Sequence, residues 1–374
     1  MISWRDFLYR IGHQTENHID ELKIRFRERM GWETAVHICP YISFGNEQSL
    51  YVKGRVLHDR GIETESDDSF WDNLTNMYYR VNSHEIKGAK MRLTYYDLIH
   101  DFYSDEDGYF GEIIPMPSAI DVKSGWHTPV IEMLESPLPF KKPLRSVAKI
   151  LVPPASVTYG VISDIDDTIL KTDATSLLKM AWNTFAKNAR SRIAFKGVAA
   201  FYRALHKGKS GNNKNPFFYV SSSPWNLYDV LIDFINLHGI PEGPLFLKDY
   251  GFTHNKIITE GHEGHKPKKI KKILNAYPEM KFILIGDSGQ KDPEIYSNII
   301  KEFPDRILAV YIRDVTIDER DVQVKKIYNS DKPEMVYSEN SLTAAIHAAK
   351  HGWIEDGMLA EIANEKAWED VIEE

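Results

Sequence analysis

Two carboxylates at the end of an apolar run are the residues of this sequence best placed to do chemistry. Asp164 and Asp166 lie two residues apart in the stretch Val161–Thr168, directly after a segment with the composition of a buried strand. Acids at this spacing can share one divalent cation. Asp164 could attack a phosphorus atom and form an aspartyl-phosphate, while Asp166 could protonate the leaving oxygen and later activate water. Solvated turns often contain such a pair, so further residues must decide between a catalytic site and a plain turn.

Hydroxyl groups follow a second apolar run. Phe217–Val220 leads into Ser221, Ser222, Ser223 and Pro224. Serine is favoured at helix N-caps and proline in the first helical turn, so a helix is predicted to begin here. A helix N-terminus with hydroxyls beside it binds anions such as phosphate. The pattern allows either ordinary capping by one serine or a phosphate site at Ser221 or Ser222.

A lysine stands at another predicted helix start. Lys266 precedes Pro267, and its ammonium could neutralise both phosphoryl oxygens and a nucleophilic carboxylate. His262 and His265 have the spacing of metal ligands, but no clear third ligand supports zinc, so we interpret them as loop residues. The neighbouring lysines coat a solvated helix face or, alternatively, form a patch that attracts an anionic interface; they are Lys268, Lys269, Lys271 and Lys272.

An acid follows a third apolar run. Asp287 comes directly after Phe282–Gly286, where its carboxylate can complete an oxygen-rich magnesium site whose remaining positions are filled by water. Asp292 either supports this loop or caps a helix that begins at Pro293. We interpret it as the cap, because aspartate is among the preferred capping residues.

The elements that must position these residues are strands of a parallel sheet. Continuous apolar strands alternate with amphipathic helices, which predicts an α/β fold with both sheet faces covered. Ligands of such sheets bind at the carboxyl ends of the strands. There the acid pair, hydroxyl, lysine and second acid occur in order, which indicates phosphoryl transfer. The strands are expected at Thr158–Ser163, Phe217–Val220, Phe282–Gly286 and Ile307–Ile312.

The first part of the chain has a different pattern. Short segments rich in β-branched and aromatic residues, such as Tyr51–Leu57 and Met91–Tyr96, predict a β-sandwich-like domain, with Ser104–Phe110 as a hairpin turn. The N-terminal segment has helical spacing and either docks on protein or meets lipid. The predicted units are an amphipathic helix at 1–31, the β-sandwich-like domain at 32–152, the catalytic domain at 153–336 and a helical tail at 337–374.

Composition excludes several classes of protein. The 374 residues carry a net charge of −8 with a pI near 6.0, which argues against a nucleic-acid binder. It also disfavours bulk electrostatic binding to anionic membranes, although a local basic patch could still bind one. The single cysteine, Cys39, permits no intrachain disulfide and fits a reducing compartment. Without a signal peptide or a transmembrane run, we expect a cytoplasmic protein with, at most, peripheral membrane contact.

Long motifs around these residues resemble the haloacid dehalogenase-like phosphatase superfamily. The resemblance is closest to the catalytic domain of actin-patch-associated phosphatidate phosphatases. It covers roughly Ser156 to Val315, under half of the chain. The motifs that carry it are Ser163–Ile169, Tyr219–Tyr228, Phe282–Tyr296 and Phe303–Arg306 leading to Tyr311–Val315.

The resemblance implies a role for each matching residue. It implies that Asp164 is the nucleophile and Asp166 the general acid and base. Ser221 and Lys266 would bind phosphate, with Ser222 as a rival for the serine role because the end of the strand cannot be fixed to one residue.

The resemblance also implies a metal, a fold and a substrate. Mg²⁺ would be held by Asp164, Asp287 and the main-chain carbonyl of Asp166. The catalytic domain would be Rossmann-like with a small helical cap at Thr172–Arg203, and the reaction would convert phosphatidate to diacylglycerol at a membrane surface. One rival hypothesis is the same chemistry on a soluble phosphate metabolite, and another is a non-catalytic membrane-binding scaffold. The sequence predicts no oligomeric state.

Overall fold

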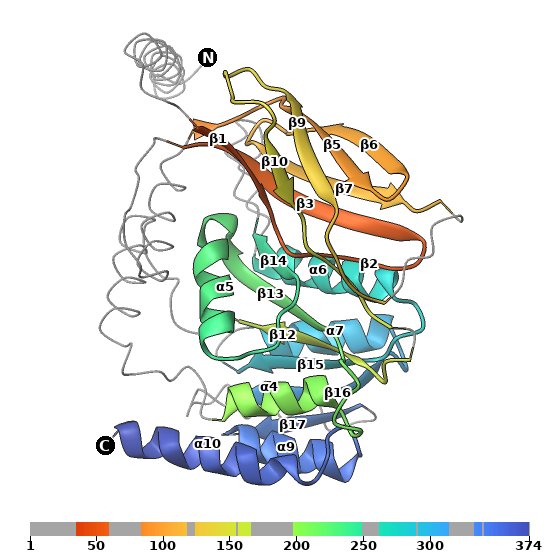
Figure 1. Cartoon of the computed structure of the whole chain (residues 1–374). Coiled ribbons are helices and arrows are strands. Elements are labelled where there is room, and N and C mark those ends of the chain that lie inside the picture. Colours follow the sequence, from red (N-terminus) through yellow and green to blue (C-terminus); the bar gives the residue numbers. More distant parts are fainter. Residues whose placement is uncertain are drawn as a thin grey trace, which may run out of the picture.

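The structure is a computed structural model, and it has a β-rich part followed by an α/β part (Figure 1). The helix predicted for 1–31 and most of the predicted cap lie outside the described residues. These are 35–59, 84–117, 124–154, 156–165, 197–248, 262–288, 291–313, 333–338 and 340–373.

The α/β part is built on one sheet of six parallel strands. Their order is β14-β13-β12-β15-β16-β17. The inner strands are apolar up to their carboxyl ends because both of their faces are covered, and this confirms the predicted α/β class with a parallel sheet. The strands are β12 (Gly160–Asp164), β13 (Phe217–Pro224), β14 (Leu245–Lys248), β15 (Phe282–Asp287), β16 (Ile307–Arg313) and β17 (Glu334–Ser338).

Helices cover both faces of this sheet. Successive side chains of a strand point to opposite faces, and β13 follows this rule: Phe217 packs in one hydrophobic cluster and Phe218 in the other. The first cluster includes side chains of α4 (Val198–Lys207), α5 (Tyr228–Leu237), α9 (Ser341–Lys350) and α10 (Met358–Glu373). The second includes side chains of α6 (His262–Ala276) and α7 (Asp292–Glu302).

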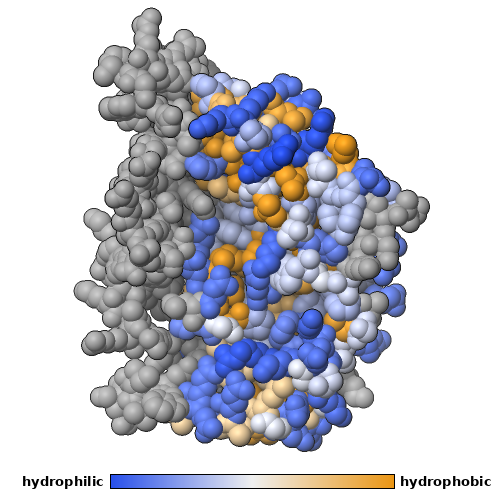
Figure 2. Space-filling view, in the orientation of Figure 1, coloured by the Kyte–Doolittle hydropathy of each residue, from blue (hydrophilic) through white to orange (hydrophobic). Residues whose placement is uncertain are grey.

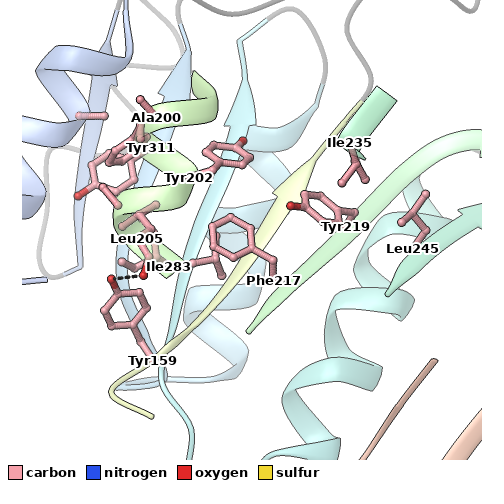
Figure 3. Close-up of a cluster of buried hydrophobic side chains, with 14 of the residues drawn as sticks. Tyr159, Ala200, Tyr202, Leu205, Phe217, Tyr219, Ile235, Leu245, Ile283 and Tyr311 are labelled. Atoms are coloured by element: carbon pink, nitrogen blue, oxygen red, sulfur yellow. Dashed lines mark hydrogen bonds between the residues drawn. The ribbon is translucent and has the colours of Figure 1, made fainter. Parts of the chain in front are cut away.

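The C-terminal helices share the core of the sheet. Figure 3 shows part of this cluster, with the Tyr159 hydroxyl donating to the Leu205 carbonyl of α4. The same hydroxyl lies 2.8 Å from the carbonyl of Trp353, between α9 and α10. The predicted boundary between the catalytic domain and the helical tail, at residue 336, falls inside β17. Within the described ranges, no helix has both the length and the hydropathy of a bilayer span.

The cap prediction is wrong at its C-terminal end. Residues 198–203 belong to α4, and Phe201 and Tyr202 are buried against the parallel sheet.

The β-rich part consists of two sheets that share one hydrophobic core. Residues such as Val52 of the seven-stranded sheet and Met91 of the four-stranded sheet are fully buried in it. Its strands are β1 (Ala35–Pro40), β2 (Ser43–Gly45), β3 (Ser49–Asp59), β4 (His84–Glu85), β5 (Lys90–Tyr95), β6 (Leu98–Tyr103), β7 (Tyr109–Pro115), β8 (Gly125–His127), β9 (Val130–Glu135), β10 (Arg145–Val147) and β11 (Ile150–Val152).

The predicted hairpin at Ser104–Phe110 is wrong. β6 and β7 belong to different sheets, so this turn carries the chain from one sheet to the other. The Asp105 carboxylate accepts hydrogen bonds from the amides of Asp107 and Tyr109. Such turn chemistry is the same in a hairpin and in a crossover, so the local sequence could not distinguish them.

Aromatic side chains of the β-rich part pack on the α/β part, and Phe44 is one of them. Phe44 of β2 is 3% exposed and packs in the second cluster of the α/β part. Its ring lies 5.4 Å from that of Phe246 and 6.2 Å from that of Tyr277. The Tyr277 hydroxyl donates to the carbonyl of Gly45 at 3.0 Å. The β-rich part is therefore held on the α/β part by apolar packing that a hydrogen bond orients.

The Phe44→Ala variant is expected to lose about 3–5 kcal/mol of unfolding free energy, because a buried ring is replaced by a cavity. Ile99→Ala is the control: Ile99 is 61% exposed, and its loss should change stability by no more than about 0.5 kcal/mol. Urea denaturation of both variants measures the difference. Equal stability of the two variants would contradict the joining role of Phe44.

Candidate active site

Three carboxylates meet at the carboxyl edge of the parallel sheet. β12 and β15 are neighbours, with Ser163 in register with Ile285, so their last residues, Asp164 and Asp287, come to the same edge. Asp292, the first residue of α7, joins them. Carboxylate oxygens of the three residues all lie within 4.8 Å of one another. The structure thus brings Asp164 and Asp287 together as predicted, and Asp166 lies outside the described residues.

Lys266 bridges two of these carboxylates. Its Nζ donates to Asp164 Oδ2 at 2.7 Å and to Asp292 Oδ1 at 2.8 Å. The Lys266 and Asp164 side chains are 4% exposed and that of Asp292 is fully buried. Burial by itself lowers the pKa of Lys266, but the Asp164 and Asp292 carboxylates outweigh it and raise this pKa above its ordinary value. The lysine is therefore a fixed positive charge at physiological pH.

The helix that carries Lys266 begins earlier than predicted. α6 starts at His262, so Pro267 lies inside the helix and does not begin it. His262 and His265 were predicted to be loop residues, and this is wrong because both belong to α6. A proline near a helix start is common at the first position, and that preference misplaced the boundary by about one turn.

Asp292 does not cap α7. The capping position is Lys291, which makes no side-chain capping bond. Asp292 Oδ1 accepts from Lys266, and Oδ2 accepts from the amide of Asp287 at 3.3 Å. The cap interpretation is therefore wrong, and the alternative holds: Asp292 supports the loop that presents Asp287. Aspartate before proline fits both roles, so no local signal separates them.

Gly286 makes room for this arrangement. A Cβ atom at this position would lie 2.5 Å from Asp292 Oδ2 and 2.9 Å from the Tyr296 ring. Both contacts are closer than non-bonded atoms allow. A glycine is therefore required between the buried strand and Asp287, because Asp292 occupies the space of a side chain.

The serines lie beside Asp164, on the opposite side from Asp287. Asp164 is in register with Val220, so Ser221 is the next residue along β13. Ser221 is fully buried and its Oγ accepts from the amide of Ser223 at 2.9 Å, whereas Ser222 is half-buried.

The helix predicted to start at these serines begins later. β13 continues to Pro224, a 3₁₀ turn follows at Trp225–Leu227, and α5 starts at Tyr228 without a side-chain cap. The capping alternative for the serines is therefore wrong, because the capping position of α5 is Leu227.

Two tyrosines that sequence reasoning missed hold the strand ends. The Tyr202 hydroxyl of α4 lies 2.6 Å from Ser163 Oγ, and that Oγ donates to the Asp164 carbonyl. Burial raises the pKa of Tyr202 to about 12, so the phenol is neutral. The Tyr296 hydroxyl of α7 donates to the Ile285 carbonyl at 2.8 Å. Buried tyrosines resemble any core residue in a sequence, and only their partners reveal this role.

The carboxylate cluster has the chemistry of a metal site. Its three donors are all carboxylates, the ligands that hard divalent cations prefer. The cluster brings three carboxyl groups to one ammonium, that of Lys266. Burying an excess of negative charge is costly, and a divalent cation would offset it. The Asp164, Asp287 and Asp292 group could therefore hold a metal ion.

The Gly286→Ala variant is expected to lose about 1–3 kcal/mol of stability, because overpacking displaces Asp292. Divalent cation binding, measured by calorimetry, should weaken with it. The matched control is Gly111→Ala in β7, where the nearest atom to the added carbon is the Tyr51 hydroxyl at 3.6 Å. Equal effects of the two alanines on stability and cation binding would contradict the crowding argument.

Comparisons with known proteins agree with the position of this site. Residues 159–314 match the family model of the catalytic domain of phosphatidate phosphatase APP1. Phosphatidate phosphatase APP1 of Saccharomyces cerevisiae is 39% identical over 155 residues, which is 41% of this chain and 25% of that protein. An uncharacterized protein of Schizosaccharomyces pombe is 28% identical over 187 residues, which is 50% of this chain and 30% of that protein. The chain thus spans about a quarter to a third of the length of these relatives.

Similarity to solved structures is low. A carbohydrate acetylesterase from Xanthomonas citri covers 86% of this chain and 75% of its own, but at 8% identity and a TM-score of 0.29. The resemblance of the motifs to phosphatidate phosphatases is confirmed by sequence: residues 159–314, which contain Asp164, Lys266 and Asp287, match the catalytic domain of phosphatidate phosphatase APP1.

Proposed function

We propose that this protein is a magnesium-dependent phosphatase that hydrolyses a phosphomonoester through an aspartyl-phosphate, with phosphatidate as its substrate. The observation that carries the proposal is the contact of Lys266 with Asp164 and Asp292 at the carboxyl edge of the sheet. A buried carboxylate beside a fixed ammonium suits attack on a phosphoryl group, because the lysine can stabilise the charge on its oxygens.

Asp164 is the proposed nucleophile. Its Oδ1 accepts from the amide of Ile165 at 2.9 Å and its Oδ2 accepts from Lys266, so the carboxylate is oriented before substrate arrives. Attack by one carboxylate oxygen on phosphorus forms the aspartyl-phosphate and breaks the bond to the ester oxygen. Asp166 gives that oxygen a proton and then takes one from the water that releases inorganic phosphate. The role of Asp166 rests on the sequence motif.

The phosphoryl oxygens would be bound by Lys266 and by Ser221 or Ser222. Ser221 Oγ already accepts a backbone hydrogen bond, and a hydroxyl that accepts one bond can also donate its proton to a phosphoryl oxygen. Ser222 is the less buried of the two. We assign the role to Ser221 and keep Ser222 as its rival.

Mg²⁺ is the proposed metal, held by Asp164, Asp287 and the main-chain carbonyl of Asp166. When bound, it would polarise the phosphoryl group and neutralise its charge. Asp292 then has a positioning role, because it holds both Lys266 and the amide of Asp287. The same inference assigns the α/β part to the haloacid dehalogenase type, preceded by a β-sandwich-like domain.

The substrate follows from the sequence resemblance and not from the shape of the site. The rival substrate is a soluble phosphate metabolite, which the same chemistry would serve, and a less favoured alternative is a non-catalytic membrane-binding scaffold. The localisation that goes with this proposal is cytoplasmic, with peripheral contact to the lipid substrate.

The Asp164→Asn variant is expected to lose at least about 10³-fold in the rate of phosphate release, because the amide cannot act as the nucleophile. Chelation of divalent cations should abolish the wild-type rate, and added Mg²⁺ should restore it. Asp101→Asn is the control, since Asp101 pairs with Arg92 on the surface and its loss should leave the rate unchanged. An Asp164→Asn variant that keeps the wild-type rate would contradict the nucleophile role, and a wild type that releases no phosphate would favour the scaffold hypothesis.

Phosphatidate in mixed micelles is expected to be hydrolysed with a higher kcat/KM than water-soluble esters such as glycerol phosphate. Matched assays of phosphate release on both substrates, with Mg²⁺ and with Asp164→Asn as the blank, measure the ratio. If the soluble esters are preferred, the chemistry stands but the lipid substrate does not.

A further inference from the structure

The three serines at the end of β13 interrupt its pairing with β14. Val220 pairs with Phe246, and Pro224 pairs with Lys248, so four steps along β13 match only two steps along β14. The residues in between are Ser221–Ser223, which we call the serine segment. Irregularities of this kind re-aim side chains and are frequent beside active sites. Because the segment lies outside the regular ladder, its position depends on what holds its two ends.

The parallel sheet holds the first end of the serine segment. Val220 is in register with Asp164 on one side and with Phe246 on the other. Within the segment, Ser221 Oγ accepts from the amide of Ser223 at 2.9 Å. This bond sets the local shape of the segment, and its placement beside Asp164 depends also on the second end.

The β-rich part holds the second end. Trp225 follows Pro224, and its ring stacks on that of Tyr41, with centroids 4.6 Å apart and planes inclined by 12°. The Lys53 ammonium lies 4.2 Å from the centroid of the same indole ring. Trp225 and Tyr41 are both buried. Stacked rings and cation–ring contacts stabilise beyond the area that they bury, so Trp225 is firmly attached to the β-rich part.

A hydrogen bond adds a second tie between the two parts. The hydroxyl of Tyr228, the first residue of α5, accepts from the amide of Ile42 at 2.6 Å. The Tyr228 ring lies 4.3 Å from that of Tyr41 and 6.0 Å from that of Trp225. Tyr41, Trp225 and Tyr228 thus form one packed set of rings, which we call the ring group.

Tyr41 is itself fixed in the connection between β1 and β2. Its amide donates to the carbonyl of Lys53 at 2.8 Å, and its carbonyl accepts from Ser43 Oγ at 2.9 Å. The buried Ser43 Oγ also accepts from the amide of Lys53 at 3.1 Å. A residue whose amide and carbonyl are both bonded to its own sheet offers a fixed surface for the ring of Trp225.

The connection that carries Tyr41 contacts both faces of the parallel sheet. Tyr41 belongs to the first hydrophobic cluster of the α/β part and Phe44 to the second. The two residues are three positions apart, so this short stretch packs on the sheet from both sides. A displacement of the β-rich part would therefore move β13, the strand that carries the serine segment.

The outer face of the β-rich part gives a weaker account of what this part does. Exposed Ile99 and Tyr103 lie on opposite sides of a charged row that crosses the four-stranded sheet. The row consists of Arg145, Glu132, Arg92 and Asp101, which are in register. Figure 2 shows hydrophilic and hydrophobic side chains intermixed over the β-rich part at the top of the molecule. The described residues of this face do not specify one kind of partner, whereas the ring group adjoins the site.

We infer that the β-rich part is a functional part of the catalytic site, because it fixes the serine segment through the ring group. The inference rests on the proposed function, in which Ser221 or Ser222 binds the phosphoryl group. Tyr41 is then a positioning residue that acts through Trp225. The carboxylates of the proposed metal site come from other elements, so the ring group governs phosphoryl binding and leaves metal binding unchanged.

Kinetics of Tyr41→Leu in the full chain test this inference. Inhibition by inorganic phosphate should weaken about tenfold, the effect of one hydrogen bond to a charged group, and kcat/KM should fall by a similar factor. Release of the alcohol product is measured, so that phosphate can be added freely. Mg²⁺ binding, measured by calorimetry, should change less than about twofold. Tyr41→Phe keeps the stacked ring and should match wild type.

Phe102→Leu is the matched control. Phe102 is buried in the core of the β-rich part, where it packs on Phe110, so this variant also loses a buried ring but leaves the ring group intact. The thermal unfolding temperature should fall in both leucine variants, whereas phosphate inhibition of the control should change less than about twofold. Equal weakening in Phe102→Leu and Tyr41→Leu, or wild-type inhibition in Tyr41→Leu, would overturn the inference.

A double-mutant cycle separates positioning from general damage. Its background is the alanine variant, at Ser221 or Ser222, that weakens phosphate inhibition. Adding Tyr41→Leu to this background should weaken inhibition by less than about twofold more, because the hydroxyl that the ring group positions is already absent. A further tenfold loss would show that Tyr41 acts elsewhere and would overturn the inference.

A milder variant serves if Tyr41→Leu does not fold. Tyr228→Phe removes only the oxygen that accepts from the Ile42 amide, and it should weaken phosphate inhibition about threefold. Unchanged inhibition in Tyr228→Phe would count against the inference in the same way.

Failure of this inference can be distinguished from failure of the proposed catalysis. An Asp164→Asn variant that keeps its rate contradicts the catalysis, whatever Tyr41→Leu does. If Asp164→Asn and a serine variant lose activity while Tyr41→Leu and Tyr228→Phe keep wild-type phosphate inhibition, the catalysis stands and the role of the ring group alone is overturned.

Discussion

The bridge from Lys266 to Asp164 and Asp292 is the interaction on which the site depends. Removing charges from water costs several kcal/mol per ion, and attraction offsets this only when the geometry is good. Here one ammonium lies 2.7 Å and 2.8 Å from two carboxylate oxygens. The strand β12 and the helices α6 and α7 must therefore end or begin at fixed positions, because a small displacement would leave a buried charge without its partner.

The rest of the α/β part meets this requirement through short polar contacts at the strand ends. Tyr202 and Tyr296 tie α4 and α7 to β12 and β15 through Ser163 and the Ile285 carbonyl. The glycine before Asp287 leaves the space that Asp292 fills. The cluster still has more carboxylates than ammonium groups, and this imbalance is what makes it suited to a cation, which with Lys266 would offset the charge of a phosphoryl group. The buried excess of carboxylates, which costs stability, is thus the same feature that supports the chemistry.

The features that could be predicted from the sequence are those that depend on local residue patterns. Continuous apolar runs are local, so the strands of the parallel sheet and the acids at their ends, Asp164 and Asp287, could be placed from sequence. The second role of Asp292, the earlier start of α6 and the crossover after β6 depend on contacts between distant segments. Capping, proline and turn preferences describe each segment alone, and in these three places tertiary packing decided the outcome. Asp166 stays a prediction from its motif.

The helix α6 links the carboxylate cluster to the junction of the two parts. Its lysines allowed two interpretations in the sequence, a solvated face or an anion-attracting patch. Lys266 turns inward to the carboxylates, whereas Lys272 lies over the ring of Tyr51 of the β-rich part. Phe44 packs on Tyr277, which follows the end of the same helix. The contact of the two parts therefore bears on the helix that positions Lys266, which gives Phe44 a consequence for the site as well as for stability.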